Sequence, residues 1–148
     1  MLYYEDLKVG DRFNTAEHTL TAEEIVEFAR RHDPQPFHTD PEAAKGTLFG
    51  RLVASGWHTA AVSMGLMVRG EMPLSGGVIG QAVEGLRWPR PVKPGDRLRV
   101  VMEVVGLEPH PVRAGFGNLR LSCRTLNQDG KAVQEMTALL LIARRPVG

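Results

Sequence analysis

The chain has 148 residues, of which 43% are hydrophobic and 24% charged, and its formal net charge is +1. These values are typical of one globular domain, covering residues 1–148, that buries a core without help from disulfides or a metal. The small net charge gives no basis for a nucleic acid or an anionic membrane as the main partner.

Three further features of the sequence concern the compartment in which the protein works. Its single cysteine, Cys123, excludes an internal disulfide framework and suits a reducing environment. The N-terminal residues show no basic stretch followed by an apolar core, so we expect no signal peptide. No run of about 18 apolar residues is present, and no membrane span is predicted. We therefore expect a cytoplasmic protein.

The first strand and the first helix are expected before residue 33. Residues 13–20 are compatible with a strand, and a helix should begin after Thr21. Thr21 and Glu24 fit a capping box, in which the threonine hydroxyl accepts from the third helical amide and the glutamate side chain reaches back to the backbone of Thr21. Pro34 disfavours the helical conformation at Asp33, so the helix should end there.

The segment that follows, residues 33–40, carries two side chains suited to proton transfer. Asp33 and His38 lie five residues apart, and a carboxylate with an imidazole is a common acid–base pair. Because Pro34 and Pro36 disfavour helix at the residues before them, we expect this segment to be extended or looped. Asp40 should then cap a short helical turn that begins at Pro41.

A second, more apolar helix is predicted over residues 56–69, with Ser55 as its N-cap and Gly70 as its stop. Its residues are apolar on almost every side, which is typical of a helix buried over most of its circumference.

The rest of the chain reads as β-structure. Strands are expected over residues 78–88 and 97–107, around Leu119, Leu121 and Cys123, and over residues 133–144, with a hairpin turn at residues 127–130. Consecutive strands joined by hairpins imply an antiparallel sheet, and the apolar helix must bury itself against it. We therefore predict an α+β hot-dog fold, in which the sheet curls around the helix. A homodimer would cover an exposed sheet edge.

This order of elements, together with two motifs, resembles the MaoC-like dehydratases, the (R)-specific enoyl-CoA hydratases of the hot-dog superfamily. Residues 33–41, Asp-Pro-Gln-Pro-Phe-His-Thr-Asp-Pro, match the family's Asp-x-Asn-Pro-x-His-x-Asp segment. Residues 87–96, Arg-Trp-Pro-Arg-Pro-Val-Lys-Pro-Gly-Asp, are close to its Phe-x-x-Pro-Val-x-x-Gly-Asp turn. The resemblance covers residues 8–142. It implies a curled sheet around one helix with an overhanging helical segment, and reversible hydration of trans-2-enoyl-CoA to (R)-3-hydroxyacyl-CoA.

The same resemblance assigns roles residue by residue. Asp33 would be the base that activates water, His38 would share the water and act as the acid, and the Gly56 amide would polarise the thioester carbonyl. For Gly56 a second reading stays open, namely that glycine only gives clearance at the start of a crowded helix. The residues expected to contact substrate are Gln35, Phe37, Ser55 and Trp57.

The chain departs from the family pattern at three positions: His32 replaces a glycine, Gln35 an asparagine, and Ser55 a histidine. The first two alter the walls of the site, and the third leaves the backbone donor of Gly56 in place. Because Asp33 stands at the C-terminal end of a helix and should be partly buried, we expect its pKa to be raised.

No metal or redox cofactor is expected, and coenzyme A enters only as part of the substrate. The histidines and aspartates near the motif straddle prolines and lack the spacing of a metal site. Met64, Met67 and Met72 read as core, with an acyl tunnel as the alternative. Two other functions stay open: a hot-dog acyl-CoA thioesterase, and a non-catalytic acyl-thioester-binding subunit.

Overall fold

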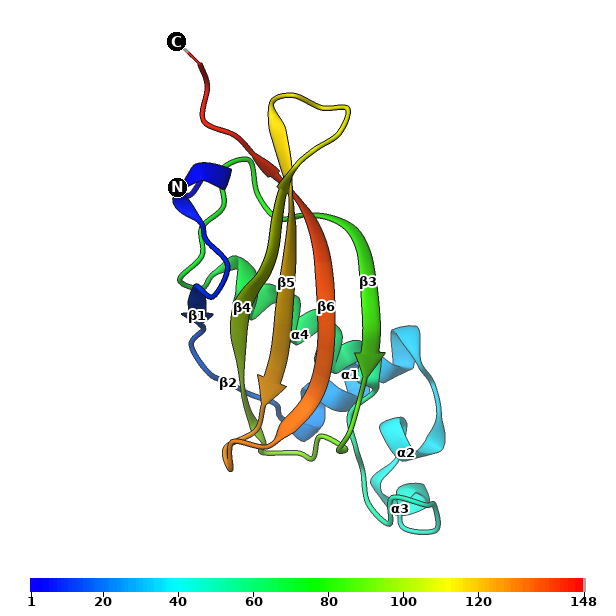
Figure 1. Cartoon of the computed structure of the whole chain (residues 1–148). Helices are drawn as coiled ribbons and strands as arrows, with labels where there is room; N and C mark the ends of the chain where they lie inside the picture. Colours follow the sequence, from blue (N-terminus) through cyan, green and yellow to red (C-terminus); the bar gives the residue numbers. More distant parts are fainter. Residues whose placement is uncertain (148) are drawn as a thin grey trace.

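The computed structural model describes residues 1–147 and shows a curled antiparallel sheet with a long helix, α4, across one face (Figure 1). This is the hot-dog arrangement that the sequence predicts. The elements in chain order are η1 (Tyr4–Asp6), β1 (Arg12–Asn14), β2 (His18–Thr19), α1 (Ala22–His32), α2 (Pro36–Thr39), α3 (Pro41–Ala44), α4 (Gly56–Val68), β3 (Ile79–Arg87), β4 (Arg97–Pro109), β5 (Phe116–Leu126) and β6 (Ala132–Ala143).

The sheet has the strand order β1-β4-β5-β6-β3, with β2 pairing separately with β4. The expected strand over residues 13–20 is therefore two short strands, both antiparallel to β4. Over residues 97–104 of β4 the alternation is strict: Leu98, Val100, Met102 and Val104 are fully buried and face the core. The first and last strands of the order, β1 and β3, leave the sheet with open edges.

Helix α4 is less enclosed than its composition predicts. Its buried residues include the polar Thr59 and Ser63, whereas Trp57 is 57% exposed and Val68 is 53% exposed. The sheet covers only one side of the helix, and the partly exposed Met64 lines a small cavity together with residues of the edge strand β3. The expectation of burial over most of the circumference is wrong for the single chain.

The caps around the site follow the sequence closely. The Thr21 hydroxyl accepts from the Glu24 amide at 3.2 Å, but the Glu24 carboxylate bonds the Thr21 hydroxyl and His18 and does not complete the capping box. Helix α1 ends at His32 with Asp33 as its C-cap, as predicted. Asp40 caps α3 by accepting from the amides of its first turn, also as predicted.

Residues 36–39 differ from expectation, because they form the short helix α2 and not a loop. Proline is well tolerated at the first helical position, where its missing N–H would have no partner. Gln35 is extended, as the following proline requires, and Pro36 itself starts the helical turn.

Among residues 1–147, no helix is both long and apolar enough to cross a membrane.

Candidate active site

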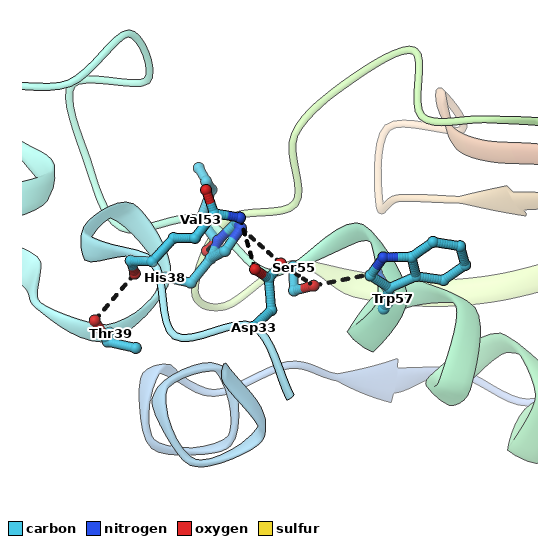
Figure 2. Close-up of polar contacts among 7 residues, drawn as sticks. Asp33, His38, Thr39, Val53, Ser55 and Trp57 are labelled. Carbon is cyan, nitrogen blue, oxygen red and sulfur yellow. Dashed lines mark hydrogen bonds and ion pairs between the residues drawn. The ribbon is translucent and has the colours of Figure 1, made fainter. Parts of the chain in front are cut away.

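The structure brings Asp33 and His38 together where α1 gives way to α2 (Figure 2). The His38 Nε2 atom lies 3.4 Å from Asp33 Oδ2, and the two side chains are 8% and 18% exposed. The helical turn of α2 places His38 on its buried side, so the prolines position the pair by starting this turn. A carboxylate and an imidazole thus share one sheltered position near the start of α4.

The second ring nitrogen of His38 fixes the tautomer of the imidazole. Nδ1 lies 2.7 Å from the carbonyl oxygen of Val53, which can only accept a hydrogen bond. Nδ1 therefore carries a proton, and Nε2 is the ring nitrogen that faces Asp33.

The Asp33 carboxylate accepts hydrogen bonds at both oxygens. Gln35 Nε2 donates to Oδ1 at 2.6 Å, and the Ser55 hydroxyl donates to Oδ2 at 2.7 Å. Burial raises the pKa of the Asp33 carboxyl, but the donors Gln35 and Ser55 and the charge of His38 outweigh it and hold the pKa below its ordinary 3.8. The expectation of a raised pKa is wrong, because it counted the helix end and burial and not the donors.

Gly56 is the first residue of α4 and lines a pocket of about 270 Å³ next to His38. The first amides of a helix have no intrahelical partner, so the Gly56 N–H is a possible donor to a bound oxygen. A Cβ atom at this position would lie 2.5 Å from Trp88 Cε2, so glycine is also needed for clearance. The two readings of Gly56 are compatible, and the clearance reading has direct structural support. The pocket is lined by Phe37, His38, Phe49, Val53, Ala54, Gly56, Thr59, Trp88, Pro89, Arg90, Pro91, Val92 and Val133.

The four residues expected to contact substrate occupy different places. Phe37 lines the pocket. Gln35 and Ser55 bond Asp33, and Ser55 is fully buried. Trp57 is exposed beside the pocket, with its ring edge against Trp88 at a centroid distance of 5.2 Å.

Trp88 is one of several pocket residues to which the sequence analysis gives no role. It stands in the proline-rich motif, where the family pattern has phenylalanine, and its indole N–H donates to Gln134 at 3.0 Å. The proline-rich motif marks this position as one of interest. Its contact with Gly56 joins segments more than thirty residues apart, so the motif alone does not predict that contact. Within residues 1–147, no three histidine, cysteine or acidic side chains come close enough to hold a metal ion.

Comparisons with known proteins give matches over most of the chain. Residues 6–117 match the sequence model of the MaoC like domain. The crystal structure of a MaoC-like dehydratase from Rhodospirillum rubrum is 48% identical, with a TM-score of 0.95, and the match covers 99% of this chain and 100% of the other. The (R)-specific enoyl-CoA hydratase of Rhodospirillum rubrum is 29% identical over 145 residues, 97% of this chain and 93% of the relative. The uncharacterized protein YdeM of Bacillus subtilis is 30% identical over 140 residues, 95% of this chain and 98% of the relative.

Proposed function

The chain belongs to the MaoC-like family, and on that premise we propose that it is a hydro-lyase that reversibly hydrates trans-2-enoyl-CoA thioesters to (R)-3-hydroxyacyl-CoA. The observation that carries the proposal is the 3.4 Å approach of His38 Nε2 to Asp33 Oδ2 beside the pocket that reaches Gly56. The relative named as an (R)-specific enoyl-CoA hydratase supports this choice of reaction.

The two side chains supply the base and the acid that hydration needs. The ionised Asp33 takes a proton from water as the water oxygen bonds to Cβ, and the double-bond electrons move towards the thioester oxygen. In this step His38 acts as the imidazolium, with protons on both ring nitrogens, and donates the Nε2 proton to Cα. The pair is restored when the proton held by Asp33 returns to His38. A lowered pKa keeps Asp33 ionised at neutral pH, so the base is present in its reactive form, although it is weaker than an unperturbed aspartate.

The start of α4 is suited to the negative charge that develops on the thioester oxygen. Gly56 lines the pocket as the first residue of α4, and in the proposal its amide donates to the thioester oxygen while the positive end of the helix dipole adds to this effect. Preorganised backbone donors of this kind are often a large part of catalysis in acyl transfer and related reactions.

The proposal includes a homodimer, no metal or redox cofactor, and a cytoplasmic location. The edge strand β3 is exposed along most of its length, and the exposed side chains of α4, Trp57 and Val68 among them, leave apolar surface uncovered on the single chain. Met64 of α4 and Val83 of β3 are both exposed and line one cavity, so the two exposed surfaces are adjacent. A second copy that docks there would cover both. The single thiol, Cys123, is free and buried, which suits a reducing compartment.

The test is an absorbance assay at the enoyl-thioester band with short, long and branched substrates. We expect Asp33→Asn and His38→Ala to lose about 10²–10⁴-fold in kcat with the fold intact, as is typical of general acid–base residues. Asp129→Asn, in the exposed turn between β5 and β6, is the matched control and should keep full activity.

Retained turnover in either active-site variant would reject the assignment. Release of free thiol from a saturated acyl-CoA would instead indicate a thioesterase. Stabilisation by acyl thioesters without turnover on any of them would indicate a non-catalytic binding subunit.

A further inference from the structure

The Ser55 side chain joins the start of α4 to the carboxylate of Asp33 (Figure 2). Its Oγ atom accepts from the Trp57 amide at 3.2 Å as the N-cap of the helix, and lies 2.7 Å from Asp33 Oδ2. Ser55 is fully buried and does not line the pocket. It therefore contacts Asp33 from the protein interior and not from the pocket.

The direction of these two hydrogen bonds follows from the atoms. An amide N–H can only donate, so the bond from Trp57 uses a lone pair of the Ser55 oxygen. An ionised carboxylate can only accept, so the single hydroxyl proton of Ser55 goes to Asp33. Each bond in such a chain polarises the next, so the amide strengthens the bond from the hydroxyl to the carboxylate.

We propose that Ser55 is a positioning residue for Asp33, which uses the first turn of α4 to hold the carboxylate ionised and turned towards His38. This inference deepens the proposed function and rests on it for its activity readout. It replaces the expectation that Ser55 contacts substrate.

Two observations support this role. Ser55 and His38 approach the same oxygen, Oδ2, while Gln35 holds Oδ1, so the carboxylate cannot rotate without losing a bond. The hydrogen bond from Ser55 is also among the causes that lower the pKa of Asp33. Because Ser55 caps the helix that begins with Gly56, one residue sets both the base and the proposed carbonyl donor.

The test removes the Ser55 hydroxyl with a residue that is still tolerated at the N-cap position. Glycine is nearly as good an N-cap as serine, so Ser55→Gly should fold, with Ser55→Ala as a second variant and Ser55→Thr restoring the hydroxyl. Ser63→Ala is the matched control, since Ser63 is a buried serine on the same helix that bonds Thr59 and Thr125 away from the pair.

Two measurements are made on each variant: the pH profiles of kcat and KM for hydration, and an NMR titration of the Asp33 carboxyl carbon in the protein without ligand. For Ser55→Gly we expect the acidic limb of the kcat/KM profile and the Asp33 titration both to move to higher pH. We also expect kcat to fall about 10–100-fold through misplacement of the base, with KM little changed. Ser55→Thr should reverse these changes, and Ser63→Ala should show none.

An unmoved Asp33 titration in folded Ser55→Gly would overturn the proposal. So would an increase in KM at constant kcat, which would indicate substrate contact, or an equal shift in Ser63→Ala. If the native protein hydrates no enoyl thioester, the proposed function fails, while the titration still decides the role of Ser55.

Discussion

The contact between Gly56 and Trp88 makes a sharp prediction for Gly56→Ala. The added Cβ would lie 2.5, 2.6 and 2.8 Å from three atoms of the indole ring. Carbon atoms normally approach to about 3.5–4.0 Å, so the ring or the start of α4 must move by about 1 Å. Trp88 is 40% exposed, but its N–H donates to the buried Gln134, so the ring can move aside only at the expense of this hydrogen bond.

The expected loss of stability follows from the overlap between the new Cβ and the ring. Overpacking in a well-filled region typically costs about 1–3 kcal/mol, so the melting temperature should fall by about 2–12 °C for a chain of this size. If the Gly56 amide also holds the thioester oxygen, its displacement should lower kcat by about 10²–10³-fold, the usual effect of losing one oxyanion donor.

The assay measures thermal unfolding and enoyl-thioester hydration for Gly56→Ala beside Gly65→Ala. The control lies on the same helix, where the new Cβ would meet only the mobile end of Arg69 at 3.1 Å, so its stability should be unchanged or slightly higher. In a protein that already carries Trp88→Ala, the further change Gly56→Ala should cost little stability relative to Trp88→Ala alone. A Gly56→Ala protein as stable as the native one, or a penalty that persists without Trp88, would refute the reasoning.

Two further predictions concern buried titratable groups. Burial lowers the pKa of His58 below its ordinary 6.5, with Glu24 opposing and His18 adding to the shift, so native His58 resists protonation. The unfolded chain therefore binds more protons, and the free energy of unfolding should fall as pH falls below about 6.5. Urea unfolding measured against pH should show a weaker dependence in His58→Phe. The same pH dependence in both proteins would contradict this prediction. Burial raises the pKa of Cys123 to about 12, so its thiol should react with alkylating reagents only after unfolding; rapid labelling of the native protein would count against this.

The caps and the catalytic motif could be predicted from the sequence because they depend on residues close together in the chain. Thr21, Asp40 and Ser55 each bond amides two or three residues away. The approach of Asp33 to His38 also follows from a short segment stiffened by prolines, although the sequence missed that Pro36 starts a helical turn.

The hydrogen bonds to the pair come from near and distant residues alike. Ser55 reaches Asp33 from 22 residues away, and the Val53 carbonyl sets the His38 tautomer from 15 residues away. Gln35 donates to the same carboxylate from only two residues away and lowers the pKa of Asp33 more than Ser55 does, but neither side chain was counted as a donor to Asp33. The sign of the pKa shift was therefore wrong.

The sequence by itself determined the hot-dog architecture, the starts of α1, α3 and α4 and the presence of a carboxylate–imidazole pair, because periodicity, caps and prolines act over one or two turns of chain. Only the tertiary structure decided which side of α4 is covered, that Trp88 closes over Gly56, and that Ser55 reaches the Asp33 carboxylate. Those outcomes depend on which distant side chains share a few ångströms of space, and short-range preferences do not specify such meetings.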